Sequence, residues 1–138
     1  MTPQQVHIVQ STWLKVLPIK ETAAQAFYDK LLEMDPSLKA LFRGSMRKQG
    51  QKLMHAIDFT VNGLSRLERI LPAIEALGWR HASYGVKDEH YDAVGAALLW
   101  TLGKGLGDAF TPEVKDAWTT AYGVLAAAMQ EATAAARV

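Results

Sequence analysis

Residues 79–86 read WRHASYGV and residues 88–95 read DEHYDAVG, and this stretch decides how the rest of the chain is interpreted. It contains two of the four histidines, His81 and His90. No two histidines are three or four residues apart, so no pair can hold one metal ion from adjacent turns of a helix. Any metal would therefore have to be held without such a pair.

Apolar residues recur with helical spacing on both sides of this stretch, and no window shows sustained strand-like alternation. The sequence therefore predicts an all-α fold. The first helix is expected to begin with a capping box, in which Thr2 is the cap and Gln5, three residues later, completes the pair. Pro3 suits the first turn of this helix. Helices are expected over residues 2–18, 20–34, 35–42, 46–64, 88–106 and 111–136.

Pro72 lies inside the apolar segment 67–77. A proline in a helix interior removes a hydrogen bond and clashes with the preceding turn. We therefore expect this segment to form short, broken helical pieces, with His81 just beyond the break.

The size and charge of the chain narrow the functional classes. Its 138 residues suit one domain, so residues 1–138 are expected to form a single unit. The net charge of +1 does not favour nucleic-acid binding. No segment is apolar and long enough to span a membrane.

The composition and the N-terminus narrow the chemistry and the location. The sequence has no cysteine, which excludes disulfides, thiolate metal sites and thioether attachment of a cofactor. The first ten residues, MTPQQVHIVQ, lack the features of a secretory signal, so the expected location is the cytoplasm.

Several common helical metal and catalytic sites are absent from the sequence. It lacks the paired Glu-x-x-His motifs of di-iron bundles and the zinc, nucleophile-elbow and phosphate-loop motifs. A single imidazole is sufficient, however, when a porphyrin supplies the equatorial ligands of an iron. His81 is the candidate for that role.

The order of several motifs carries a family resemblance. The segment 79–86, followed by Tyr91 and Val94-Gly95, resembles the proximal-histidine region of single-domain bacterial globins and of the globin half of flavohaemoglobins. The residues Gln49 to Met54 are similar to the Gln-x-x-Lys-Leu-Met pattern of single-domain globins from methane-oxidising bacteria. The resemblance covers essentially the whole chain and implies a globin fold, a three-over-three helical sandwich around one haem.

The same resemblance implies the roles of the site residues. His81 would be the proximal ligand of a b-type haem, and Tyr28, Gln49 and Leu53 would line the distal, gas-binding side. Gln51 is the alternative to Gln49, but the spacing to Leu53 favours Gln49. The other expected haem contacts are Phe42, Lys52, Arg80, Tyr84, Val86, Tyr91 and Val94, with Lys52 and Arg80 as candidate partners of the propionates.

The two distal polar groups predict high oxygen affinity. Oxygen bound to ferrous haem carries superoxide-like charge, so the donors of Tyr28 and Gln49 would stabilise it and slow its release. On the proximal side, the sequence departs from the flavohaemoglobin pattern, because Thr133 replaces the last-helix glutamate. The carbonyl near Leu77 then becomes the expected acceptor for His81, and peroxidase chemistry is disfavoured.

These expectations leave several functions open. The first is reversible oxygen binding, for transport or scavenging. The second is nitric oxide dioxygenation, which would need a separate reductase because the sequence contains no flavin module. Gas sensing, peroxide chemistry and a haem-free helical adaptor are the remaining alternatives, and CO is a further possible ligand.

Overall fold

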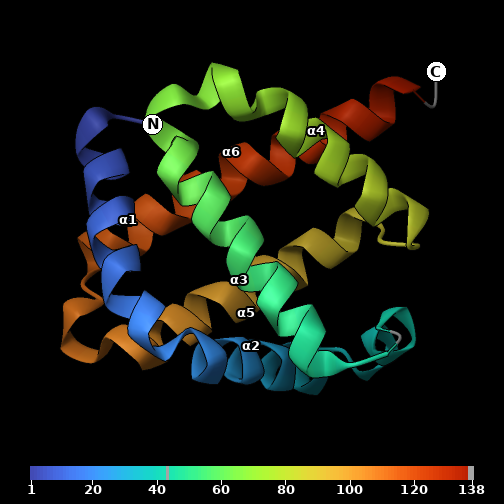
Figure 1. Cartoon of the computed structure of the whole chain (residues 1–138), viewed down its shortest axis with the longest axis horizontal. Coiled ribbons are helices and arrows are strands. Elements are labelled where there is room, and N and C mark those ends of the chain that lie inside the picture. The colour runs from blue at the N-terminus through green and yellow to red at the C-terminus, as the bar shows by residue number, and fades with distance from the viewer. Residues whose placement is uncertain (43, 137–138) are drawn as a thin grey trace.

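The computed structural model describes residues 1–42 and 44–136, and this part of the chain is helical, with no strand. Its α-helices are α1 (Pro3–Val16), α2 (Lys20–Met34), α3 (Met46–Gly63), α4 (Leu67–Ser83), α5 (Asp88–Leu106) and α6 (Pro112–Ala136). A short 3-10 helix, η2 (Pro36–Leu41), lies between α2 and α3. Figure 1 shows α1, α3 and α4 in front of α2, α5 and α6, which is the expected three-over-three sandwich.

The first helix begins as its sequence predicts. The backbone N–H of Gln5 donates to Thr2 Oγ1 at 3.1 Å, and the backbone N–H of Thr2 donates to Gln5 Oε1 at 2.9 Å. This reciprocal pair satisfies two donors that a helix start would otherwise leave free. The capping box is confirmed.

Two tryptophans tie α1 to α6 in the main core. The rings of Trp13 and Trp118 lie 6.1 Å apart between centroids, at an interplanar angle of 58°. Trp118 Nε1 donates to Thr12 Oγ1 at 2.9 Å, and Trp13 Nε1 donates to a carboxylate oxygen of Asp58 on α3 at 2.8 Å. Both indole N–H groups are thus satisfied, as buried tryptophans require. This end of the molecule is a closed, fully packed core.

The expectation of broken helical pieces over residues 67–77 is wrong. Helix α4 runs without interruption from Leu67 to Ser83, with Pro72 as its sixth residue. Pro72 and Glu68 are both exposed, so water can satisfy the Glu68 carbonyl that loses its N–H partner. His81 therefore lies within the last turn of α4 and not beyond a break.

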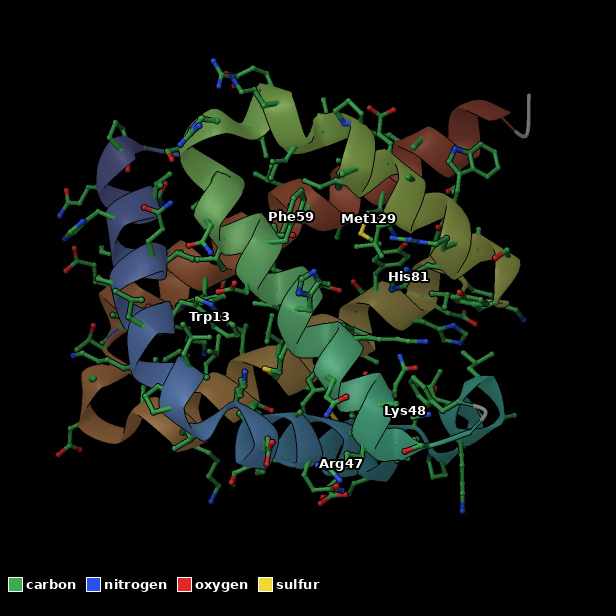
Figure 2. All side chains as sticks on the ribbon, in the orientation of Figure 1. Trp13, Arg47, Lys48, Phe59, His81 and Met129 are labelled. Carbon is green, nitrogen blue, oxygen red and sulfur yellow. The ribbon has the colours of Figure 1, made fainter. Side chains whose placement is uncertain are left out.

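Glycine allows α4 to approach α6 closely. A Cβ atom at Gly78 would lie 2.7 Å from the carbonyl oxygen of Met129 and 2.9 Å from its Cα. Only a residue without a side chain permits this backbone contact. Figure 2 shows Met129 on the side of α6 that faces α4.

Within the described residues, no helix is both long enough and apolar enough to cross a membrane.

Candidate functional site

The geometry of His81 is fixed by its own helix. Its Nδ1 atom lies 2.8 Å from the carbonyl oxygen of Leu77, one turn earlier, as the sequence predicted. Because a carbonyl can only accept, Nδ1 carries the proton and Nε2 is left with its lone pair. Figure 2 shows His81 on the side of α4 that faces the interior. The ring thus presents one free nitrogen.

The surroundings of His81 favour the neutral imidazole. Burial lowers its pKa, the Leu77 carbonyl acts in the opposite direction, and the positive charge of Arg80 lowers the pKa further. A metal ligand must be the neutral form of histidine, so the environment suits that role.

Helix α4 packs closely against α6, but few of its own side chains are buried. Of its 17 residues only Ile74 and Gly78 are buried, and both Leu77 and His81 are half-buried. Helices of this length are normally stabilised by burying an apolar face. The inner face of α4 is therefore suited to cover by a further apolar group.

Tyr28, Phe42 and Gln49 come together where α2, η2 and α3 meet. Tyr28 is only 4% exposed, and its ring centroid lies 5.2 Å from that of Phe42 at an interplanar angle of 74°. Its hydroxyl is 3.5 Å from the backbone carbonyl oxygen of Gln49, a weak hydrogen bond at most. Gln49 is half-buried, whereas Gln51 is exposed. The Tyr28 hydroxyl is thus close to Gln49 and only weakly bonded.

Burial raises the pKa of Tyr28, and the side-chain amide of Gln49, which can donate to the phenolate, partly offsets that shift. The phenol therefore keeps its proton at neutral pH and remains a donor.

The remaining predicted contacts differ in exposure. Leu53, Val86, Tyr91 and Val94 are half-buried, whereas Lys52 and Arg80 are exposed. Tyr84 is the most accessible, at 66% exposed, and follows directly after α4. The half-buried residues suit the inner wall of a haem pocket, and the exposed lysine and arginine suit its solvent-facing edge. Tyr84 is so exposed that it lies at that edge at most.

No carboxylate is bonded to His81 among the described hydrogen bonds. Thr133 is buried, and its hydroxyl donates to the Gln130 carbonyl of its own helix at 3.0 Å. The backbone carbonyl of Tyr91 accepts from the Tyr122 hydroxyl at 2.6 Å. His81 itself is bonded to the neutral carbonyl of Leu77. In the described residues, no group of three or more His, Cys, Asp or Glu side chains could hold a metal ion.

Two apolar residues beside Tyr28, Leu41 and Leu98, were not among the predicted site residues. Leu41 and Leu98 pack with Phe42, Leu53 and Val94 against the cluster that includes Tyr28. Leu98 could have been found from the sequence, because it lies four residues after Val94 and shares its helix face. Leu41 could not, since short 3-10 helices have no extended apolar period.

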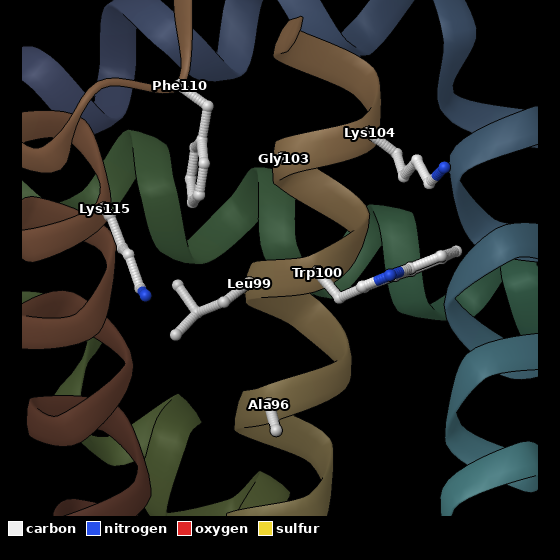
Figure 3. A pocket seen from close by; sticks show the side chains of 7 residues that line it. All are labelled: Ala96, Leu99, Trp100, Gly103, Lys104, Phe110 and Lys115. Atoms are coloured by element: carbon white, nitrogen blue, oxygen red, sulfur yellow. The ribbon is translucent and has the colours of Figure 1, made fainter.

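A separate groove of about 510 Å³ lies on the outer side of α5 (Figure 3). It is lined by Ala96, Leu99, Trp100, Gly103, Lys104, Phe110 and Lys115. None of these is a candidate site residue, so the groove is distinct from the region of His81 and Tyr28.

The helical sandwich and the inward-facing imidazole of His81 match a known family of proteins. The family model described as Globin matches residues 25–129, and the chain therefore belongs to the globin family. Membership of this family implies that the protein binds haem.

Curated relatives match this chain over part of their length. A flavohemoprotein of Bacillus subtilis is 35% identical over 124 residues, which are 88% of this chain and 31% of the relative. A flavohemoprotein of Vibrio cholerae is 34% identical over 133 residues, 91% of this chain and 33% of the relative. The chain thus spans about a third of the length of these relatives.

Solved structures share the whole fold. A bacterial globin from Campylobacter jejuni is 27% identical, with a TM-score of 0.79 and 91% of each chain covered. A hexacoordinated heme protein from a tardigrade has a TM-score of 0.87 at 16% identity, covering 96% of this chain and 94% of its own. An engineered carbene transferase from Rhodothermus marinus, provisionally described as a nitric oxide dioxygenase, has a TM-score of 0.86 at 24% identity, covering 99% and 96%. The last two likenesses concern the fold alone.

Proposed function

We propose that the protein is a haem b globin that reversibly binds oxygen at ferrous iron with high affinity. The observation that carries the proposal is the bond from His81 to the Leu77 carbonyl, which leaves Nε2 free on a helix with few buried side chains. The residues fit a haem, because a neutral imidazole and half-buried apolar side chains are both present. We also propose that residues 1–138 are one globin domain, which the family match over residues 25–129 supports.

The type of haem follows from the composition. Covalent attachment of a c-type haem uses cysteine thioethers, and the sequence contains no cysteine. A non-covalent b-type haem is therefore proposed, with His81 as its protein ligand. Lys52 and Arg80, both exposed, would meet the propionates.

When bound, the haem would supply a ferrous iron able to take up oxygen. The Tyr28 phenol and the Gln49 side-chain amide would each donate a hydrogen bond to the gas ligand. At about 1 to 1.5 kcal/mol each, two such bonds would slow oxygen release by about 30- to 160-fold if they were additive. Slow release suits oxygen scavenging or oxygen chemistry better than bulk delivery.

The proximal hydrogen bond supports reversible binding over peroxide cleavage. Leu77 offers His81 a neutral carbonyl, whereas a carboxylate would push more electron density toward the iron. Thr133 cannot supply that charge, and its hydroxyl is bonded within α6.

Nitric oxide dioxygenation is the second candidate. It is favoured by the likeness to flavohemoproteins. A reductase would have to return the iron to the ferrous state. Nitric oxide added to the oxygenated protein should yield nitrate and ferric protein once, and continued turnover should occur only with an electron donor.

The visible spectrum of the ferrous protein, before and after oxygen is added, tests the main proposal. We expect a five-coordinate spectrum that converts to a stable oxygenated form. His81→Ala should lose both, whereas His55→Ala, which alters an exposed histidine of α3, should retain them. A six-coordinate spectrum before gas is added would favour electron transfer or sensing, and no haem signal at all would overturn the proposal.

A further inference from the structure

The groove on the outer side of α5 has an apolar floor (Figure 3). Ala96, Leu99 and Gly103 all line it, and their helical spacing places them on one face of α5. From Ala96 to Gly103 this floor runs for about 10 Å along the helix. Exposed apolar strips of this kind often mark a binding site.

An aromatic ring forms one wall of the groove. Phe110 is half-buried, and a Cβ atom at Gly103 would lie only 3.3 Å from its ring. The absence of a side chain at Gly103 therefore lets the ring rest close to the backbone of α5. It also leaves the floor open at this point.

The other wall is a tryptophan that contacts two cations. Figure 3 shows Trp100 and Phe110 on the two sides of α5. Trp100 is 38% exposed, with the Nζ atoms of Lys30 and Lys104 at 5.1 Å and 5.5 Å from its ring centroid, within the range of cation–π contacts. Lys30 also pairs with Glu33 at 3.6 Å. These contacts hold the ring beside the groove.

The charged residues that line the groove have one sign. They are Lys104 and Lys115, both exposed, and no aspartate or glutamate lines the groove. Figure 3 shows the side chain of Lys115 extending toward that of Leu99. Lys104 lies over the Trp100 ring, whereas Lys115 forms no ion pair in the described part of the chain. The groove is thus complementary to an anion that also has an apolar body.

The same charges disfavour a second copy of this chain as the occupant. A two-fold contact through the groove would bring Lys104 and Lys115 of both copies into one interface, where like charges repel. The volume of about 510 Å³ is that of a small-molecule site, for which roughly 300 to 1,000 Å³ is usual. A small ligand therefore suits the groove better than a protein surface does.

We propose that this groove binds a small monocarboxylate with an apolar body, of which a medium-chain carboxylic acid is the simplest example. Its carboxylate meets the ammonium group of Lys115, and its apolar body covers Leu99 between the rings of Phe110 and Trp100. Binding removes apolar surface from water and gives Lys115 an anionic partner. The proposal is independent of the oxygen-binding proposal, because the groove shares no residue with the candidate haem site.

The test titrates the holoprotein with decanoate and follows the indole N–H resonances by nuclear magnetic resonance. Carbon monoxide keeps the ferrous haem diamagnetic, and Trp100→Phe assigns the Trp100 signal. We expect that signal to shift with a saturable dependence on decanoate, whereas the signal of Trp13, which is 1% exposed, stays in place. Decylammonium, which has the same chain length and the opposite charge, should bind at least about tenfold more weakly.

The lysines are tested by a charge-matched pair of double variants. Lys104→Gln/Lys115→Gln removes both charges of the groove and should weaken decanoate binding by about tenfold or more. Lys15→Gln/Lys48→Gln makes the same change in net charge at exposed positions on α1 and α3. This control should stay within about twofold of the wild type.

The floor is tested at Ala96, which is exposed and therefore tolerates larger side chains. Ala96→Glu adds a carboxylate to the groove, which would repel the ligand or pair with Lys115, and should also weaken binding by about tenfold. Ala96→Gln, of the same size but uncharged, should bind more tightly than Ala96→Glu. Equal binding by the two variants would contradict the assigned position of the ligand.

Other outcomes overturn the proposal. Equal losses in the two lysine double variants would mean that only net charge matters. A change in the visible spectrum of the haem without a shift of the Trp100 signal would place decanoate at the iron. Sedimentation that finds a dimer of the wild type and a monomer of Ala96→Glu would make the groove an interface between copies of this chain.

Discussion

His81 and Tyr28 differ in how strongly the protein holds their polar atoms. The Nδ1 atom of His81 has a short hydrogen bond of 2.8 Å within its own helix, whereas the Tyr28 hydroxyl has only a 3.5 Å contact with Gln49. A weakly bonded hydroxyl loses little when it turns toward a new acceptor. The histidine is thus held in one orientation, whereas the Tyr28 hydroxyl keeps a proton that it can donate to another acceptor.

Removing the Tyr28 hydroxyl should therefore speed oxygen release. For Tyr28→Phe we expect the dissociation rate constant to rise by about 5- to 13-fold, the equivalent of one hydrogen bond of about 1 to 1.5 kcal/mol. Stopped-flow replacement of oxygen by carbon monoxide measures it. Thr22→Val, which removes an exposed hydroxyl from the same helix, should leave the rate unchanged. An unaltered rate in Tyr28→Phe would refute its distal role.

At the scale of residues, the burial of side chains in the candidate site could be predicted in part. The Leu53 spacing favoured Gln49 over Gln51 as the inward residue, and in the structure Gln49 is half-buried, with its backbone carbonyl near the Tyr28 hydroxyl. The exposure of Tyr84 could not be predicted, because it depends on where α4 ends. The roles of these residues toward a haem remain predictions.

At the scale of elements, α4 is the helix whose length was misjudged. Sequence patterns treat proline as a helix breaker, but the cost of Pro72 is one hydrogen bond on an exposed face. The contact of Gly78 with the backbone of α6 is a tertiary interaction, and it helps to hold the helix together. The other long helices have regular apolar spacing, and each ends close to the residue that the sequence predicted.

The small number of buried side chains in α4 predicts what haem removal does. In the haem-free protein, backbone amides of residues 67–83 should exchange faster with deuterated solvent, because only Ile74 and Gly78 of that helix are buried. Amides around Trp13 and Trp118 should stay protected, since those rings lie in the closed core. Mass-spectrometric exchange of both forms measures this, and equal exchange of α4 with and without haem would contradict it.

At the scale of the whole molecule, buried tyrosines set the alkaline limit of stability. Burial raises the pKa of Tyr28, Tyr91 and Tyr122, and nearby acidic groups add to the shift for the last two. A tyrosine with a raised pKa in the folded state favours the unfolded state once pH exceeds its ordinary value of about 10. The stability that these phenols contribute is thus complete below about pH 10 and lost as pH rises above it.

Tyr122→Phe should make this alkaline loss less steep. At neutral pH the variant should lose about 1 kcal/mol of unfolding free energy, because the 2.6 Å hydrogen bond to the Tyr91 carbonyl disappears. Urea unfolding between pH 7 and pH 11 measures both effects. Tyr84→Phe, at an exposed position, should lose unfolding free energy with pH as the wild type does. If Tyr122→Phe loses it just as steeply, the Tyr122 phenol is not a cause of the alkaline loss.

The contact of Gly78 with Met129 also has a consequence for evolvability. The helix that carries His81 rests on main-chain atoms of α6, which every amino acid at position 129 other than proline would still provide. Position 129 can therefore vary without removing that support, whereas position 78 must remain glycine.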